Sequence, residues 1–412
     1  MIDLRKKFLI YGYGISGKSI SKYLKRKKSS YKIYDDFSDL SLFKESINLQ
    51  KLKKNIKSFD YFIVSPSIKI NKNHILYPFK KKVLIDLDFL SLEIKNQIVF
   101  GVTGTEGKSS ICSYLYQYLS DSNKTLIIGN YGNTILDKDN LEKILTKTKI
   151  IIIELSSYQL DKIKFLKINH AIITNIYSDH LQYHGSFSNY VKSKFKIQSF
   201  LNKDGCLHIS NSDKREYSSL INIQNKNINT ISNLKFKNKI FGLDINLLNE
   251  NFTKKILSFS KLNYDHNKKL KNLPFRNELI ENRSNPTIIN DSKSTNLENS
   301  IIKINQINLK NKIIILGGNP KKSIIKKNTI KNSLVLIFGP NRFKINKSLE
   351  LINSKFFTFV DLENLFRFLK VVIHQTKWDV ILFSPGGESF DQFKDYSHRG
   401  RIFNKYIKKF KI

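Results

Sequence analysis

Short apolar runs recur along the chain, and most of them end in a polar or glycine-rich loop. Runs of this kind, bounded by turn residues, are typical of buried strands in an α/β sheet. They predict strands at Phe8–Tyr11, Tyr31–Tyr34, Tyr61–Val64, Ile98–Val102, Ile150–Ile153, Ala171–Asn175, Thr287–Asn290, Ile313–Leu316, Leu334–Phe338 and Val380–Ser384. Intervening stretches predict helices near Lys18–Arg26, Ile111–Leu119 and Gly400–Phe410. This order indicates doubly wound sheets with ligand sites at their carboxyl edges.

The length of the chain, 412 residues, exceeds one ordinary core and suits two or three domains. Three segments carry separate signatures, at residues 1–95, 96–272 and 273–412. Runs rich in Lys, Asn and Ser near 221–240 and 261–272 are interpreted as surface loops or a weak boundary. We therefore expect an α/β protein of three domains, with a Rossmann-like first domain, a P-loop ATPase-type middle domain and a Rossmann-like last domain.

The first segment begins with a strand, a turn and a helix that resemble a nucleotide-binding unit. The turn reads GYGISG at residues 12–17, and Asp35 and Asp36 follow the second strand. Glycines let the backbone approach a phosphate at a helix N-terminus. Ser65 begins a loop at the end of the third strand, another place where such sheets bind ligands. The pattern favours a nucleotide site. A plain tight turn and a nicotinamide-dependent oxidoreductase are the alternatives, and the second leaves the rest of the chain unexplained.

The middle segment carries a stronger signal, the loop GVTGTEGKSS at residues 101–110. A strand, a glycine loop, Lys-Ser and a helix are the parts of a P-loop. Val102 replaces the first glycine of the usual pattern, but Gly104, Gly107, Lys108 and Ser109 are in place. Lys108 is expected to reach the β- and γ-phosphates of ATP, and the Ser109 hydroxyl to bind Mg²⁺.

Two further strand ends in this segment carry candidate metal ligands. Glu154 ends an apolar strand, as the carboxylate beside a P-loop does, although an ordinary strand-end glutamate is the alternative. Asp179 and His180 follow the next strand, with His184 four residues later. His180 alone reads as a plain loop histidine, but its neighbours at the adjacent strand ends favour a metal ligand.

Composition adds the cellular setting and one misleading feature. The formal net charge of +37 suggests a nucleic-acid binder, but the lysines are scattered and Ala171 is the single alanine. An A/T-rich genome explains this bias, so neither nucleic-acid nor membrane binding is expected. No apolar run is long enough for a membrane span. Cys112 and Cys206 are too few for a disulfide framework, which favours the cytoplasm.

These motifs in this order resemble the Mur ligase family over nearly the whole chain. The strings that carry the resemblance are GTEGKSS, GNYGN (129–133), ELSSYQLD, TNIYSDHLQYHG, YVKSK, NDSKSTN, LGGNPKKS and SPGGESFDQFKDYSHRG. The last string is similar to the D-glutamate-adding member, and unlike the alanine- and diaminopimelate-adding members. The resemblance implies a monomeric enzyme that uses ATP and Mg²⁺ to join D-glutamate to UDP-N-acetylmuramoyl-L-alanine through an acyl phosphate.

The resemblance also implies roles for individual residues. The UDP substrate would be bound by Ile15, Ser16, Asp35, Asp36, Ser65, Asn133, Ser156 and Gln159. ATP would be bound by Gly104, Thr105, Gly107, Lys108, Ser109, Ser110, Asn249, Arg276, Asp291 and Lys293. D-Glutamate would be bound by Thr295, Lys321, Ser389 and Tyr396. The metal ligands would be Ser109, Glu154, His180 and Lys194, with Lys194 carbamylated, and Lys108, His180 and Lys194 would be catalytic.

The chain departs from the family pattern at three places. The usual His-Asn segment before a helix of the middle domain is missing, so Asn249 is only a guess for the adenine contact. Glu106 adds a carboxylate to the phosphate loop, and Tyr396 stands where Phe is common. Another amide ligase of the same family, such as a different Mur ligase or folylpolyglutamate synthetase, remains the nearest alternative.

Overall fold

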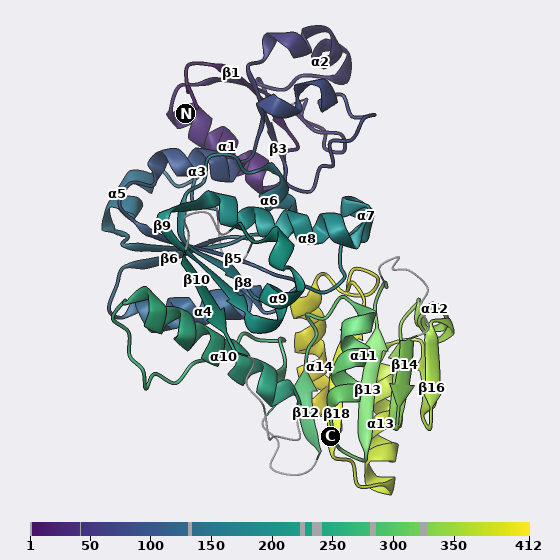
Figure 1. The fold of residues 1–412 in the computed structure, drawn as a ribbon. Coiled ribbons are helices and arrows are strands. Elements are labelled where there is room, and N and C mark those ends of the chain that lie inside the picture. Colours follow the sequence, from purple (N-terminus) through teal and green to yellow (C-terminus); the bar gives the residue numbers. More distant parts are fainter. Residues whose placement is uncertain are drawn as a thin grey trace. The chain divides into compact units, whose positions relative to one another are not determined.

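A computed structural model describes the chain at residues 2–41, 43–130, 134–222, 227–232, 241–280, 286–320 and 328–412. The chain divides into two compact units. The first comprises Met1–Asn233 and Phe252–Leu270, and the second comprises Leu234–Asn251 and Lys271–Ile412. Each unit is an α/β structure built on mainly parallel sheets, as the sequence predicts (Figure 1). None of the described helices has the length and apolar character needed to cross a membrane.

The N-terminal part of the first unit is a parallel sheet of four strands in the order β2-β1-β3-β4. Its strands are β1 (Lys7–Tyr11), β2 (Ser30–Tyr34), β3 (Tyr61–Val64) and β4 (Val83–Leu84). Its helices are α1 (Ile15–Arg26), α2 (Leu49–Asn55) and α3 (Asp86–Glu93). Residues of this sheet and of the following one belong to a single buried apolar cluster, which accounts for their place in one compact unit.

The rest of the first unit is a parallel sheet of six strands in the order β10-β9-β8-β5-β7-β6. Its strands are β5 (Ile98–Thr103), β6 (Thr125–Gly129), β7 (Ile150–Glu154), β8 (Ile168–Ile173), β9 (Leu201–Ser210) and β10 (Asn227–Ile231). Its helices are α4 (Lys108–Ser120), α5 (Leu141–Lys147), α6 (Ser157–Lys162), α7 (Leu181–His184), α8 (Phe187–Phe195) and α9 (Asn211–Glu216). Helix α10 (Phe241–Ser260) begins in the second unit, and its second half packs with α4 on one sheet face, opposite α6 and α8 (Figure 1).

The second unit contains a sheet in the order β11-β12-β18-β13-β15-β17, in which only the edge pair β11 and β12 is antiparallel. Its strands are β11 (Glu278–Ile280), β12 (Thr287–Asn290), β13 (Lys312–Gly317), β15 (Ser333–Phe338), β17 (Lys355–Phe359) and β18 (Val380–Gly386), and β14 (Asn328–Lys331) pairs separately with β16 (Leu349–Ile352). Helices α11 (Leu297–Gln306) and α12 (Arg342–Lys347) cover one face, and α13 (Leu362–Gln375) and α14 (Tyr396–Phe410) cover the other.

The structure corrects several predicted boundaries. Helix α1 begins at Ile15 and not near Lys18, because Gly14 caps it in an extended conformation and the turn joins the helix directly. Helix α14 begins at Tyr396 because Asp395 accepts a hydrogen bond from His398 N at 2.7 Å, an N-cap that the prediction missed. Strand β10 lies in a stretch predicted to be loop, since its polar residues suit the edge of a sheet.

Candidate active site

Strand order brings three loops of the central sheet together. Strand β5 lies between β7 and β8, and all three are parallel. Their carboxyl ends therefore meet at one edge, where the phosphate loop follows β5, the stretch from Glu154 follows β7, and the stretch from Thr174 follows β8. The three motifs recognised in the sequence thus converge in space.

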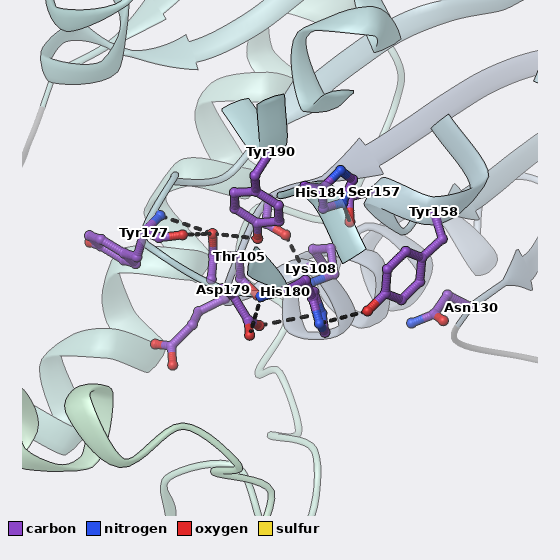
Figure 2. Close-up of polar contacts among 12 residues, drawn as sticks. Thr105, Lys108, Asn130, Ser157, Tyr158, Tyr177, Asp179, His180, His184 and Tyr190 are labelled. Carbon is purple, nitrogen blue, oxygen red and sulfur yellow. Dashed lines mark hydrogen bonds and ion pairs between the residues drawn. The ribbon is translucent and has the colours of Figure 1, made fainter. Parts of the chain in front are cut away.

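The phosphate loop depends on two glycines with left-handed backbone. Gly104 has φ +146°, and a Cβ there would lie 1.9 Å from Thr174 Oγ1. Gly107 has φ +77° and forms the N-cap of α4. The Thr105 hydroxyl also accepts a hydrogen bond from Tyr177 N at 2.9 Å, and it shares a hydrogen bond with the Tyr190 hydroxyl at 3.0 Å (Figure 2). The loop is therefore held by the segment after β8 and has no room for a side chain at Gly104.

The ammonium group of Lys108 lies against the backbone of the phosphate loop. Lys108 Nζ donates to Gly104 O and Thr105 O, both at 2.9 Å. Carbonyl groups at this spacing hold the ammonium group at the start of α4, where the helix N-terminus also favours an anion. Lys108 is placed to contact a phosphate bound in the loop.

Ser109 and Glu154 form a buried polar pair beside the loop. Ser109 Oγ donates to Glu154 Oε2 at 2.6 Å, and Asn130 Nδ2 donates to Glu154 Oε1 at 2.8 Å. Glu154 is only 1% exposed. A hydroxyl and a carboxylate at a strand end are hard oxygen ligands of the type that Mg²⁺ prefers, together with phosphate oxygens.

His180 follows β8 in a left-handed conformation, with φ +54°. Its Nε2 lies 3.4 Å from Asp179 Oδ2, and its Nδ1 shares a hydrogen bond with the Tyr158 hydroxyl at 2.8 Å (Figure 2). His184 Nε2 shares a hydrogen bond with Ser157 Oγ at 3.0 Å, and burial lowers the pKa of His184 to about 4. Both imidazoles are therefore oriented by neighbours, and His184 is neutral at neutral pH.

Lys194 is a buried lysine on α8, 2% exposed. Its Nζ donates to Gly104 O at 2.7 Å and lies 4.5 Å from the centre of the Tyr190 ring. Burial, followed by repulsion from Lys108, holds the pKa of Lys194 well below its ordinary value. Lys194 therefore belongs to the phosphate-loop site and has the buried, easily neutralised amine that carbamate formation requires.

The side chains around the phosphate loop can be compared with those that a Mg²⁺ ion requires. No cluster of three or more His, Cys, Asp or Glu side chains that could hold a metal exists among the described residues. The Ser109–Glu154 pair and the buried amine of Lys194 nevertheless lie beside the same loop, and a carbamate on Lys194 would add two hard oxygens. The residues fit a Mg²⁺ ion that shares its ligands with a nucleotide phosphate, and they do not fit an all-protein metal centre.

A separate cavity of about 510 Å³ lies in the first unit, between the N-terminal sheet and the central sheet. Four residues predicted to bind the UDP substrate line it: Ile15, Ser16, Ser156 and Gln159. Ser156 caps α6, and Gln159 Oε1 accepts from its backbone N at 2.8 Å. The cavity joins the GYGISG turn to the ELSSYQLD segment, as expected for a substrate that extends from one nucleotide site to the other.

Asp35, Asp36 and Ser65 are outside this lining and are engaged in the fold. Asp35 accepts from Tyr13 N at 2.6 Å, and its backbone hydrogen bonds outweigh burial, so its pKa is lowered. Asp36 Oδ1 accepts from the Tyr11 and Tyr34 hydroxyls at 3.1 and 3.0 Å. Ser65 Oγ donates to Gly12 O at 3.3 Å. The two carboxylates therefore hold the turn and the strand ends together.

The predicted residues of the second unit lie mainly near the carboxyl ends of β12 and β18. Asp291 forms a buried ion pair with Lys303, at 2.7 Å, and accepts from Ser384 Oγ at 3.0 Å. Lys293 Nζ lies 4.2 Å from the centre of the Tyr396 ring. Ser389 is buried, whereas Asn249, Arg276, Thr295 and Tyr396 are partly exposed. Asn133 and Lys321 lie outside the described residues.

Several side chains of the site were missed as individual residues by the sequence reasoning. Asn130 holds Glu154, Tyr158 orients His180, and Tyr190 holds both Thr105 and Lys194. All three lie within strings that carry the family resemblance, GNYGN, ELSSYQLD and YVKSK. The sequence motifs therefore included these three residues, but their individual roles depend on contacts between strand ends that only the structure shows.

A protein-family model and a solved structure show which class of protein this chain is similar to. Residues 102–273 match the family model of the Mur ligase middle domain. The structure of MurF ligase from Thermotoga maritima in complex with ADP aligns with a TM-score of 0.57 and 15% identity, covering 100% of this chain and 99% of that one. This likeness shows the fold. The resemblance to Mur ligases is confirmed by this match at residues 102–273.

The curated relatives narrow the class. A UDP-N-acetylmuramoylalanine–D-glutamate ligase of Francisella philomiragia subsp. philomiragia is 28% identical over 428 residues, covering 98% of this chain and 97% of the relative. The protein of the same name from Francisella tularensis subsp. novicida is 28% identical over 420 residues, covering 97% and 95%. This chain is therefore similar over nearly its whole length to proteins named as ligases of this kind.

Proposed function

We propose that this protein is an ATP-dependent ligase that adds D-glutamate to UDP-N-acetylmuramoyl-L-alanine. The observation that carries the proposal is the convergence of Lys108, Ser109, Glu154, His180 and Lys194 at one sheet edge, beside a cavity of about 510 Å³. The D-glutamate-type string near the C-terminus and the names of the curated relatives select this member of the family.

The proposed reaction has two steps. The alanine carboxylate of the substrate takes the γ-phosphoryl group of ATP, and the amine of D-glutamate then displaces phosphate from the acyl phosphate. The protein positions the groups and neutralises charge. Lys108 offsets the negative charge of the transferred phosphoryl group, while the N-terminus of α4 and the loop amides bind it. Bound Mg²⁺ would supply Lewis-acid stabilisation of the phosphate oxygens.

Substrate binding divides between the two sheets of the first unit. Ile15 and Ser16 at the start of α1 would bind the diphosphate through backbone amides, since a helix N-terminus favours anions. Ser156 and Gln159 would face the muramoyl-alanine end. Asp35 and Asp36 would act mainly by holding the turn, because their oxygens already accept hydrogen bonds from the protein.

The remaining assignments rest on the same proposal. The chain would act in the cytoplasm as a monomer, with UDP-N-acetylmuramoyl-L-alanine and D-glutamate as its small-molecule partners and without nucleic acid or membrane. Its three functional domains would be residues 1–95 for UDP, 96–272 for ATP and 273–412 for the amino acid. Arg276, Asp291 and Lys293 would contribute to ATP binding, and Thr295, Lys321, Ser389 and Tyr396 would bind D-glutamate.

Phosphate release tests this assignment directly. The protein is incubated with UDP-N-acetylmuramoyl-L-alanine, ATP and Mg²⁺, and candidate amino acids are added one at a time. D-Glutamate should give the fastest release, with an amide product of matching mass. Faster release with L-alanine, L-lysine or diaminopimelate would assign the protein to another amide ligase of the family, and a folate substrate in place of the UDP substrate tests folylpolyglutamate synthetase.

A further inference from the structure

Lys162, the last residue of α6, is a buried cation that binds two segments distant in the chain. The side chain is 8% exposed, and its Nζ donates to Pro66 O at 2.7 Å and to the Tyr183 hydroxyl. Both acceptors are uncharged, and burial lowers the pKa of Lys162 to about 8, although Asp161 acts in the opposite direction. Burial of a cation against neutral acceptors is unfavourable, so stability alone gives little reason for a lysine here.

The first of the two segments forms part of the wall of the substrate cavity. Pro66 and Ser67 line this cavity in the loop after β3. Ile68 N donates to Ser65 O at 3.0 Å, which closes the loop into a turn around these two residues. Ser65 Oγ donates to Gly12 O at 3.3 Å and so joins the loop to the GYGISG turn. Lys162 therefore binds a part of the cavity wall that is connected to the predicted nucleotide turn.

The second segment is the one that carries His180. Tyr183 N donates to His180 O at 3.0 Å, and the Tyr183 ring lies edge-on against Tyr158, with 4.4 Å between the ring centres. The Tyr158 hydroxyl in turn shares a hydrogen bond with His180 Nδ1 at 2.8 Å (Figure 2). A displacement of Tyr183 would therefore disturb both the backbone of His180 and the side chain that orients its imidazole.

We propose that Lys162 is a positioning residue that holds the cavity wall at Pro66 in a fixed relation to the His180 segment. This inference rests on the proposed function. In that reaction, a substrate held in the cavity must present its carboxylate to the phosphate loop, and small errors of position are costly in rate. Lys69 adds a second contact between the same segments, but its exposed Nζ lies 3.4 Å from Gln182 O. Lys162 supplies the buried and shorter connection.

Replacement of Lys162 by methionine tests this role, because the apolar stem is kept and the ammonium group is removed. In Lys162→Met, kcat for phosphate release should fall by about tenfold or more, since the substrate and the His180 segment lose their alignment. The Kd for UDP-N-acetylmuramoyl-L-alanine, measured by titration calorimetry without ATP, should stay within about threefold of wild type. Lys164→Met is the matched control, because exposed Lys164 donates to Lys81 O, outside the cavity lining, and its kcat should be unchanged.

Tyr183→Phe separates positioning from general damage, since it removes the hydroxyl that accepts from Lys162 and keeps the ring on Tyr158. Each single variant should lower kcat, and the double variant should lose no more than the weaker single variant, because both changes remove one contact. Thermal unfolding first establishes which variants are folded, and Tyr183→Phe carries the test if Lys162→Met is not. Wild-type kcat in a folded single variant, or additive losses in the double variant, would overturn the assignment.

Nuclear magnetic resonance of ¹⁵N-labelled histidine gives a readout that needs no substrate. The His180 signal, identified by its absence in His180→Asn, should shift in Lys162→Met and stay in place in Lys164→Met at the same pH. An unmoved His180 signal in folded Lys162→Met would contradict the coupling, whatever reaction the protein catalyses. The proposed function fails separately, in the wild-type protein, if an amino acid other than D-glutamate supports faster phosphate release.

Discussion

Lys194 shows how position changes the chemistry of a residue that is otherwise abundant. The chain has 71 Lys and Arg residues, so composition alone gives no reason to select this one. In the structure it is 2% exposed, bonded to a carbonyl of the phosphate loop, and near the ring of Tyr190. A buried amine whose pKa is lowered can lose its proton and react with CO₂, whereas an exposed lysine stays protonated.

We predict that Lys194→Ala lowers the rate of phosphate release by about 100-fold or more, because an anionic group that organises the phosphate site is lost. Acetate or formate added to the variant should restore part of the activity by occupying the vacated space. Lys192→Ala is the matched control, since Lys192 lies on the same helix and is exposed. Wild-type activity of Lys194→Ala in buffer equilibrated with CO₂ would remove the carbamate from the mechanism.

At the scale of single residues, the sequence predicted the chemistry better than the contacts. GTEGKSS identified Lys108 and Ser109 because a phosphate loop is a local motif whose parts are adjacent in the chain. The contacts of Asp35 and Asp291 could not be predicted from the sequence, because each carboxylate accepts hydrogen bonds from groups that are distant in the chain and close only in the fold.

At the scale of elements, neighbouring strands of the central sheet hold a pair of imidazoles, of which His208 is fully buried and His170 is partly buried. His170 on β8 and His208 on β9 share a hydrogen bond between Nδ1 and Nε2 at 3.0 Å, and Asn229 on β10 contacts the other ring nitrogen of His208 at 3.1 Å. Phe100 on β5 stacks on His170. Burial lowers the pKa of His170 to about 4 and that of His208 to about 3. These strands therefore hold both rings in the neutral form.

This pair should make the first unit sensitive to acid. Because both pKa values are lower in the folded state than the ordinary value of about 6.5, the unfolded chain binds more protons between pH 6.5 and 4. The contribution to stability is complete above pH 6.5 and is lost as the pH falls, by at most about 1.4 kcal/mol per pH unit for each histidine.

Replacement of one ring tests this expectation. In His208→Asn, the free energy of unfolding should fall less steeply with acid than in wild type, although the variant is less stable at neutral pH. Urea unfolding followed at several pH values between 7 and 4 measures the slope. His266→Gln is the control, because His266 is exposed and its replacement should leave the slope unchanged. An unaltered slope in His208→Asn would show that the pair does not control acid stability.

The elements themselves were largely predictable where they are buried. Tyr61–Val64 and Thr287–Asn290 were predicted with their observed bounds, since both are apolar runs closed by polar loops. Strand β10 was missed because Asn227–Ile231 carries polar residues at a sheet edge, where burial does not impose an apolar pattern. The early starts of α1 and α14 depend on capping, which extends a helix into residues that periodicity alone assigns to a turn.

At the scale of the whole molecule, the net charge of +37 contrasts with the cavity proposed to bind the nucleotide-linked substrate. The described residues that line this cavity include no lysine or arginine. An anionic substrate would be bound there by neutral polar groups and helix N-termini, while the surface charge acts only at a distance. The basic composition thus affects encounter with the substrate more than its contacts in the cavity.

Because the surface lysines lie outside the cavity lining, we predict that the KM for the UDP-linked substrate depends only weakly on salt. Raising KCl from about 0.05 to 0.5 M shortens the Debye length to a few ångströms, so long-range attraction is screened while contacts within the cavity persist. The KM for UDP-N-acetylmuramoyl-L-alanine should therefore rise by no more than about threefold, with kcat nearly constant at fixed free Mg²⁺. A protein that uses its lysines to bind nucleic-acid phosphates would lose about a thousandfold or more in affinity over a smaller range. Duplex DNA at 0.15 M KCl should accordingly leave phosphate release unchanged. A steep rise of KM with salt, or inhibition by DNA at that ionic strength, would show that surface cations bind the substrate phosphates directly.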